Sequence, residues 1–259
     1  MDEVVLIEKK GNIAFIRINN PPVNSLGRKI TETLNTLLDQ VLADTNVKCL
    51  VITGAGNKVF ASGADIRELE TLSEAQGIEL LTHVKEVFGK LLELPKPTIA
   101  AINGHALGGG LELALHCDFR VAVENAKFGL PEINLGIIPA AGGTQLLPRL
   151  IGMTRARWLL FSGEVISSQY ALEIGLIDRL VKEEKALMEE VAEMCKILST
   201  KPPLAYRAVK NAIKVSREIP FSQALREETK LFGKLCSTQD KAEGVRAFLE
   251  KRQPQFKGE

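Results

Sequence analysis

Strand-like and helix-like segments alternate through the first half of this 259-residue chain, and this alternation limits its possible folds more than any other feature. Short apolar runs at residues 50–54, 98–102 and 119–123 are typical of strands buried on both faces. The intervening segments 30–42 and 74–94 carry apolar residues at helical spacing. Because strands connected through helices pair in parallel, the sequence predicts an α/β fold built from parallel units.

The two ends of the chain differ from this pattern. Residues 4–9 and 13–19 predict two strands joined as a hairpin at the start of the chain. From Gly142 onward the patterns are mainly helical. We therefore expect an α/β core over residues 1–195 and a helical region over residues 196–259. The apolar faces of that helical region exceed what a single layer needs, so we expect it to pack against another subunit.

Composition excludes several classes of protein. A net charge of +1 provides no basic field for nucleic acid or an anionic membrane. No apolar run approaches the roughly 20 residues that span a bilayer, and the start of the chain lacks the pattern of a signal peptide. Four widely spaced cysteines form no CxxC pair, which is typical of free thiols in a reducing compartment. We expect a cytoplasmic protein with no membrane or nucleic-acid partner.

A run of three glycines, Gly108 to Gly110, separates a buried strand pattern from an apolar helix. Glycine lets a ligand approach the backbone closely, and the first amides of a helix have no partner inside the helix. These amides lie at the positive end of the helix dipole, where they stabilise negative charge. The run therefore predicts an anion-binding site, and the nearby Glu112 suggests chemistry on a carbonyl compound.

Glu112 has two interpretations. Its apolar neighbours predict a buried carboxylate, which is costly unless it is paired or hydrogen-bonded. It is either a structural residue paired with an arginine such as Arg120, or a general acid or base whose pKa is shifted by burial.

Glu132 lies in a turn-rich segment after Pro131, and such a glutamate is most often a solvated loop residue. The segment that follows, residues 138–144, is rich in small residues and predicts a narrow cleft with a backbone wall. Residues 61–66 form a further small-residue segment that lets backbone amides approach a ligand, or an ordinary strand-to-helix turn. Asp65 suits the N-cap of the next helix in either case.

Several common sites are absent from the sequence. It contains no phosphate-binding GxxxxGKS/T loop, no GxGxxG spacing, no GxSxG nucleophile turn and no HExxH metal motif. The three histidines, His83, His105 and His116, are scattered, so we expect structural or surface roles for them and no metal site.

Three segments in this order, 60–66, 97–118 and 128–144, resemble the enoyl-CoA hydratase/isomerase (crotonase) superfamily, most closely its bacterial-type enoyl-CoA hydratases, and the resemblance covers essentially the whole chain. It implies a ClpP-like fold, a spiral of ββα units with a helical C-terminal trimerisation region. It also implies homotrimers or hexamers, an acyl-CoA substrate, and no cofactor besides the coenzyme A of that substrate.

The same resemblance implies roles for individual residues. The backbone amides of Ala64 and Gly109 would bind the thioester oxygen, and Ala61, Asp65, Ile66, Gly108 and Ala140 would contact the substrate. Hydratases of this family carry glutamates at the positions of Glu112 and Glu132, whereas many isomerases and hydrolases lack one of them. The resemblance thus implies syn addition of water to a trans-2-enoyl-CoA, with Glu112 as base and Glu132 as proton donor to Cα.

The sequence departs from the family pattern at two positions, and two alternative functions remain open. Ala140 stands where the family often has glycine, and Leu146 replaces a commonly basic residue. Residues 24–26, 107–114 and 251–259 also look like the 3-methylglutaconyl-CoA hydratases, one relative of which binds RNA through a lysine-rich helix. Here the matching segment 29–40 includes Glu32 and Asp39, so no basic stripe forms. A non-catalytic RNA- or protein-binding module is the alternative from another class, and the two glutamates argue against it.

Overall fold

The larger of two sheets follows the predicted pattern of strands. The computed structural model describes residues 4–259. β1 (Val5–Lys10) and β2 (Ile13–Ile18) form the predicted antiparallel hairpin, and β2 then pairs in parallel with β3 (Cys49–Gly54). β5 (Thr98–Ile102) and β7 (Phe119–Val123) follow in parallel, and the short β10 (Arg179–Val181) completes the order β1-β2-β3-β5-β7-β10.

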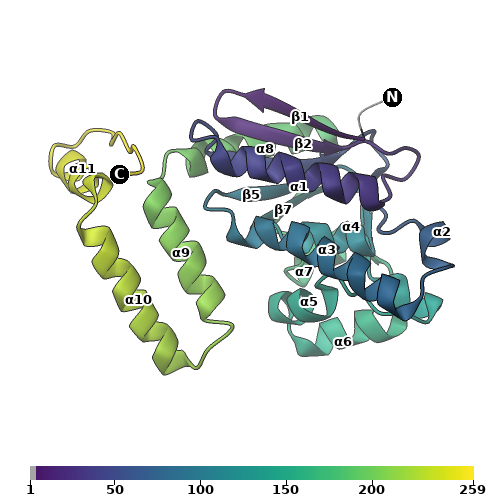
Figure 1. Ribbon diagram of the computed structural model, residues 1–259. Coiled ribbons are helices and arrows are strands. Elements are labelled where there is room, and N and C mark those ends of the chain that lie inside the picture. The colour runs from purple at the N-terminus through teal and green to yellow at the C-terminus, as the bar shows by residue number, and fades with distance from the viewer. Residues whose placement is uncertain (1–3) are drawn as a thin grey trace.

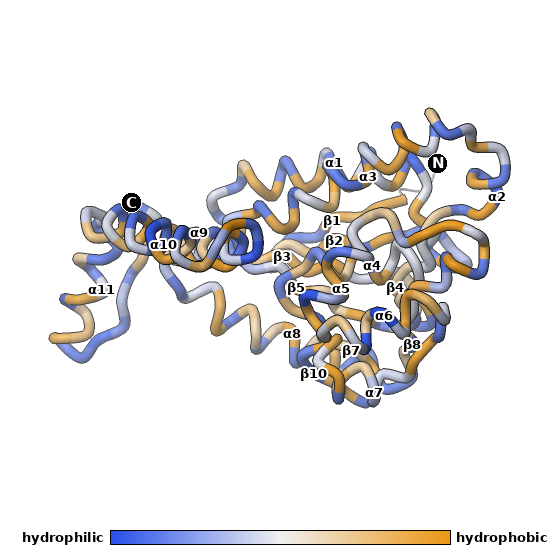
Figure 2. The backbone as a smooth tube through the Cα atoms, turned by 90° about the horizontal axis from the view of Figure 1, so that it is seen from below, coloured by the Kyte–Doolittle hydropathy of each residue, from blue (hydrophilic) through white to orange (hydrophobic). Residues whose placement is uncertain are grey.

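Helices cover both faces of this sheet. α1 (Arg28–Ala43) and α3 (Glu74–Glu93) lie on one side, and α8 (Glu184–Ser199) lies on the other (Figure 2). Every residue of β3 and β5 is consequently buried, as expected for central parallel strands. α1 buries five of the six apolar residues whose spacing predicted the helix, whereas the sixth, Leu42, is exposed; the buried ones are Ile30, Leu34, Leu37, Leu38 and Val41.

The second sheet was not predicted from the sequence. Four short strands, β4 (Val59–Ala61), β6 (His105–Leu107), β8 (Lys127–Gly129) and β9 (Ile166–Ser167), pair in that order. Local pattern predicted no strand around residues 59–61, because a strand of three residues is too short to show an alternating pattern. Asn103 fixes the crossing between the sheets: its Nδ2 donates to the carbonyl oxygens of Gly54 at 2.9 Å and Gly56 at 2.6 Å.

Three strands of the second sheet, β4, β6 and β8, each follow directly after a strand of the first sheet and are followed by a helix, whereas β9 comes after a helix. β3 leads to β4 and then to α2 (Ile66–Leu69), whereas β5 leads to β6 and then to α4 (Gly109–Leu115). This repeat is the ββα spiral that the resemblance implies. The other short elements of the core are η1 (Pro131–Leu135), α5 (Gly143–Ile151), α6 (Met153–Ser162) and α7 (Ser168–Glu173).

The C-terminal helices stand to one side of the two sheets (Figure 1). They are α9 (Pro203–Val215), α10 (Phe221–Cys236) and α11 (Gln239–Leu249). Residue 195, the expected end of the core, lies inside α8, so the chain leaves the core a few residues later. α9 and α10 contain no buried residue in this single chain, although both have apolar faces.

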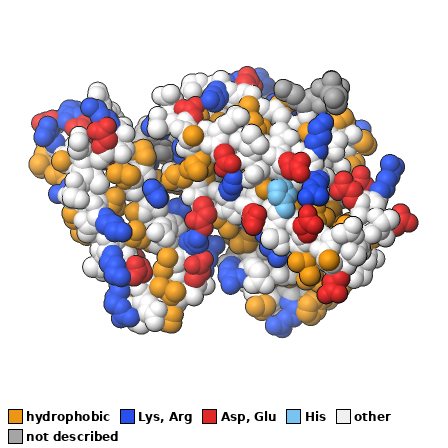
Figure 3. Space-filling view, in the orientation of Figure 1, with side chains coloured by type: hydrophobic (Ala, Val, Ile, Leu, Met, Phe, Trp, Pro, Cys, Tyr) orange, Lys and Arg blue, Asp and Glu red, His pale blue; other side chains and the backbone are white. Residues whose placement is uncertain are grey.

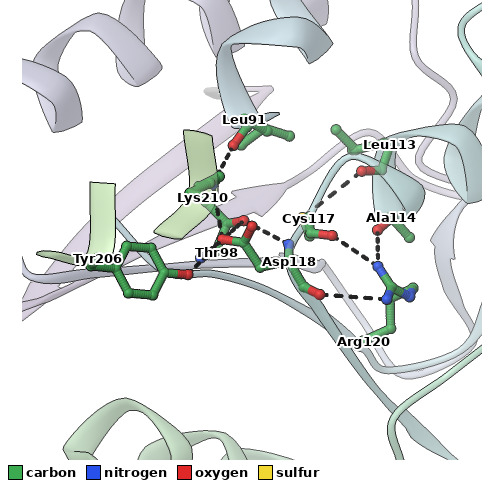
Figure 4. A network of polar contacts seen from close by, with 9 residues as sticks. All are labelled: Leu91, Thr98, Leu113, Ala114, Cys117, Asp118, Arg120, Tyr206 and Lys210. Carbon is green, nitrogen blue, oxygen red and sulfur yellow. Dashed lines mark hydrogen bonds and ion pairs between the residues drawn. The ribbon is translucent and has the colours of Figure 1, made fainter. Parts of the chain in front are cut away.

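A polar network centred on Asp118 attaches α9 to the core (Figure 4). Oδ2 of Asp118 accepts hydrogen bonds from the Tyr206 hydroxyl at 3.1 Å and from Lys210 Nζ at 2.9 Å. It also accepts from the backbone N–H and the hydroxyl of Thr98, at 2.9 Å each. Because Lys210 is mostly buried, this ion pair is screened less than one on the surface.

Candidate active site

The fold brings Ala64 and Gly109 together from two separate ββα units. Gly109 is the first residue of α4, and Ala64 lies in the turn between β4 and α2. A Cβ atom placed on Gly109 would lie 3.3 Å from Cα of Gly63 and 3.8 Å from the backbone nitrogen of Ala64. Within residues 4–259, neither the Ala64 nor the Gly109 amide donates a hydrogen bond. Two unpaired donors therefore lie side by side at a helix start, where negative charge is stabilised.

The close approach of α4 depends on its glycines. A Cβ atom on Gly110 would lie 2.0 Å from the carbonyl oxygen of Ala61, so no larger residue fits between α4 and β4. Gly108 precedes the helix with a φ of +53°, a conformation that glycine adopts without strain. The glycine run is thus required by the packing that places the two amides together.

Glu112 lies one turn into α4 with 3% of its surface exposed. Its Oε1 accepts a hydrogen bond from the backbone N–H of Gly143 at 2.7 Å. Burial is the main cause that raises the pKa of Glu112 to about 7, and the negative charge of Glu132 raises it further, against the opposing effect of the Gly143 N–H. A carboxyl group with this pKa can gain or lose a proton at neutral pH.

Arg120 is not the partner of Glu112. Its guanidinium donates to the carbonyl oxygens of Leu176 and Cys117 and lies 3.4 Å from a carboxylate oxygen of Asp178. Glu112 forms no salt bridge in the part of the chain that the structure describes. The structural interpretation of Glu112 as an arginine-paired residue is therefore wrong.

Glu132 reaches the same site from η1. Its Oε1 lies 3.0 Å from where a Cβ atom on Gly108 would be, which puts the carboxyl group against the glycine run. Its Oε2 is buried and has no hydrogen-bond partner among residues 4–259. Burial raises the pKa of Glu132 above its usual value. Glu132 is therefore not the solvated loop residue that its local sequence favours.

The other expected substrate-contacting residues lie around these groups. Asp65 caps α2 by accepting a hydrogen bond from the Arg67 backbone N–H at 2.9 Å, as its position predicted. Ile66 is exposed beside it, whereas the side chain of Ala61 is fully buried in β4. Ala140 is half-buried just before Ala141, at the start of the turn that leads to Gly143.

Two contributors to the site had no clear sequence signal. The Gly143 amide meets Glu112 only because α5 packs against α4, although the small-residue segment 138–144 indicated a backbone wall. Lys85 of α3 lowers the pKa of Glu112 through its charge, a small effect compared with burial.

Among residues 4–259, no three histidine, cysteine, aspartate or glutamate side chains converge as metal ligands. Over the same range, no helix has the length and apolar character needed to cross a bilayer.

Comparison with known proteins places these features in a family. The family model described as "Enoyl-CoA hydratase/isomerase" matches residues 8–259. A probable enoyl-CoA hydratase of Bacillus subtilis is 42% identical over 248 residues, which cover 95% of this chain and 96% of that protein. A crotonyl-CoA hydratase of Syntrophomonas wolfei is 42% identical over 258 residues, which cover 98% of each.

Solved structures agree with the sequence matches. The crystal structure of an enoyl-CoA hydratase from Bacillus anthracis superposes with a TM-score of 0.94 at 39% identity, covering 99% of this chain and 100% of that one. This confirms the predicted crotonase-type α/β fold. Over residues 8–259, the chain thus belongs to the enoyl-CoA hydratase/isomerase family.

Proposed function

We propose that this protein is an enoyl-CoA hydratase that adds water reversibly to a trans-2-enoyl-CoA and forms the 3-hydroxyacyl-CoA. The observation that carries the proposal is that two carboxyl groups, the buried Glu112 and the half-buried Glu132, flank the glycine run beside the free amides of Ala64 and Gly109. Relatives named crotonyl-CoA hydratase and short-chain-enoyl-CoA hydratase support it, at 42% and 39% identity.

The two amides supply electrostatic stabilisation. The thioester oxygen of the substrate accepts hydrogen bonds from the N–H groups of Ala64 and Gly109. Attack of water at C3 moves the π electrons of the C2=C3 bond toward this oxygen, which becomes an enolate oxygen. Amide donors already held in place by α4 and the 62–65 turn stabilise this charge without reorganisation, and one such donor typically contributes about 10²–10³ in rate.

The two carboxyl groups move the protons. Glu112, as a carboxylate, removes a proton from the attacking water while the oxygen–C3 bond forms. Glu132, as a carboxylic acid, donates its proton to C2 as the enolate collapses. The pKa of Glu112, raised to about 7, lets this group exchange a proton near neutral pH, and burial also raises the pKa of Glu132 above its usual value. A proton passed from Glu112 to Glu132 then restores the starting state.

The chemistry proposed here needs no cofactor besides the coenzyme A of the substrate. Two carboxyl groups and two amides account for every proton and for the developing charge. Ala61, Asp65, Ile66, Gly108 and Ala140, which surround these groups, are proposed to contact the substrate. The length and branching of the acyl chain stay open, since a methylglutaconyl-CoA hydratase from rat is 37% identical over 98% of this chain.

We also propose that residues 196–259 pack between subunits of a homotrimer or hexamer. Phe221, Phe232 and Phe248 are 78%, 70% and 83% exposed in the single chain. Hydrophobic side chains lie exposed across the lobe formed by α9, α10 and α11 (Figure 3). Exposed aromatic side chains of this number favour a protein interface.

Binding to RNA is not part of the proposed function. In α1, Arg28 pairs with Glu32 and Glu79, and Asp39 pairs with Lys90, so the helix presents balanced charges.

We further propose that the protein works in a reducing compartment such as the cytoplasm. The spacing of the four cysteines supports this, since they are far apart in the sequence and form no CxxC pair.

The test is an assay of hydration with crotonyl-CoA, hexenoyl-CoA and 3-methylglutaconyl-CoA, using the wild type, Glu112→Gln, Glu132→Gln and the surface control Glu74→Gln. We expect the wild type and the control to hydrate at least one substrate, and each site variant to lose about 10²-fold or more. Wild-type turnover in both site variants would contradict the proposal, as would RNA binding in a salt-dependent shift assay with no thioester chemistry.

A further inference from the structure

His116 is a buried titratable group that the proposed mechanism does not use. It follows the last residue of α4, one turn after Glu112, and 5% of its surface is exposed. Its Nδ1 lies 2.8 Å from the backbone carbonyl oxygen of Glu112. A carbonyl oxygen only accepts hydrogen bonds, so Nδ1 carries the proton and donates it. Burial lowers the pKa of His116, which favours the neutral form of the ring.

The ring of His116 also fills the space beside Gly142. A Cβ atom on Gly142 would lie 2.7 Å from Cε1 and 3.2 Å from Nε2 of His116. The same Cβ atom would lie 3.4 Å from Cδ1 of Leu146. Gly142, with a φ of +115°, therefore packs closely against these two side chains in a conformation that favours glycine. Phe88 of α3 packs edge-on against the same imidazole, with ring centroids 5.5 Å apart.

Gly142 is the residue directly before Gly143, whose N–H donates to Oε1 of Glu112. His116 thus contacts both the backbone of Glu112 and the turn that holds the Gly143 amide. Through Nδ1 it holds the backbone of Glu112, and through its opposite edge it supports the turn that presents the amide to the Glu112 carboxyl group.

We propose that His116 is a positioning residue for Glu112, and that with Leu146 it fixes the Gly142–Gly143 turn at the distance at which the Gly143 N–H meets the carboxyl group. The proposal rests on the role of Glu112 as the base in the proposed function. It also gives a role to Leu146, which stands where the family commonly has a basic residue.

The groups around Glu112 determine how its pKa would change if the Gly142–Gly143 turn moved. When ionised, Glu132 of η1 disfavours the ionised form of Glu112, whereas Lys85 of α3 favours it. The backbone N–H of Gly143 favours the ionised form through its 2.7 Å hydrogen bond, and the nearby Ala141 amide acts in the same direction. If the turn moves away, the carboxylate loses the Gly143 donor while its burial and the charge of Glu132 remain. Its pKa then rises, and a displaced base also removes the proton from water less efficiently.

The first experiment compares kcat, KM and the pH profile of the wild type with those of His116→Ala. We expect kcat to fall about 10- to 100-fold with little change in KM, since misplaced catalytic groups cost rates of this order. We also expect the acidic limb of the kcat profile to move to higher pH. Cys117→Ala is the matched control, because it truncates the next buried side chain at the same helix end.

Two further variants distinguish a positioning role of His116 from a general loss of packing around α4. Leu146→Ala, which truncates the other side chain packed close to Gly142, should move the acidic limb in the same direction. His116→Asn keeps an N–H donor near the position of Nδ1 and should retain more activity than His116→Ala, and it replaces that variant if the alanine protein does not fold. An unchanged profile in the folded His116 and Leu146 variants, or an equal shift in Cys117→Ala, would overturn the proposal. Full activity in Glu112→Gln would instead refute the proposed function.

Discussion

The backbone N–H of Gly143 donates a 2.7 Å hydrogen bond to the carboxyl oxygen Oε1 of Glu112, which lies 31 residues earlier in the chain. This bond joins the start of α5 to α4 and gives a buried carboxyl group with no arginine partner one fixed donor. The N–H favours the ionised form of Glu112, which can act as a base, while burial raises the pKa of the group to about 7. Four predictions follow from this arrangement and from the contacts of the C-terminal helices.

The rate of hydration should fall on the acidic side of neutral pH. Glu112 has a pKa of about 7, so the fraction in the base form decreases as the pH drops through that value. Since Glu112 and Glu132 interact, the limbs of the profile belong to the pair of groups. The measurement is kcat/KM for crotonyl-CoA from pH 5 to 9, and a profile that is flat between pH 5 and 7 would contradict this assignment.

Glu112→Gln should stabilise the fold at alkaline pH while it removes activity. The folded state raises the pKa of Glu112 from 4.5 to about 7, so the folded state binds the proton more tightly and stability falls as the pH rises through this range. Above pH 7 the neutral amide should raise the free energy of unfolding by up to about 3 kcal/mol. Urea denaturation at pH 5 and pH 8.5, at equal protein concentration, should show the gain only at the higher pH. Glu74→Gln should show no such difference.

Ala64→Pro should remove one of the two amide donors. Proline has no N–H, and the loss of one donor to a developing oxyanion typically lowers kcat about 10²–10³-fold. Ala64→Gly retains the N–H and should stay within about tenfold of the wild type. Circular dichroism establishes that the proline variant is folded. A folded proline variant as active as the glycine variant would show that the Ala64 amide is not a donor to the substrate.

Asp118→Ala should release α9 from the core. The substitution removes the acceptor for Tyr206 and for the mostly buried ammonium group of Lys210. Breaking a fully buried pair costs about 3–5 kcal/mol, and because this pair is partly buried we expect a smaller loss. We expect a lower free energy of unfolding together with partial dissociation of the trimer or hexamer in light scattering. Lys214→Ala, which breaks an exposed pair with Glu93, should change neither by comparison. A monomeric wild type would refute the proposed assembly itself.

Much of the larger sheet followed from local patterns. Central strands such as β3 and β5 were predictable because burial on both faces requires continuous apolar runs, and α1 because one face of a helix repeats every 3.6 residues. The second sheet was missed, since β4 and β6 have only three residues each and are held by Asn103 and by pairing with each other. Asp65 was correctly predicted as an N-cap, because capping depends on neighbouring residues alone.

The sequence by itself determined the α/β class, the free donors at the start of α4 and the presence of two glutamates in small-residue surroundings. Only the tertiary structure decided which groups meet. Local pattern left Glu112 open to pairing with Arg120 and favoured solvent for Glu132, whereas the packing of α4, α5 and η1 gave Glu112 the Gly143 amide and buried Glu132 against the glycine run. The physical reason is that the pKa of a carboxyl group and its partners depend on what surrounds it in space, and residues 64, 109, 112, 132 and 143 become neighbours only when the ββα units coil together.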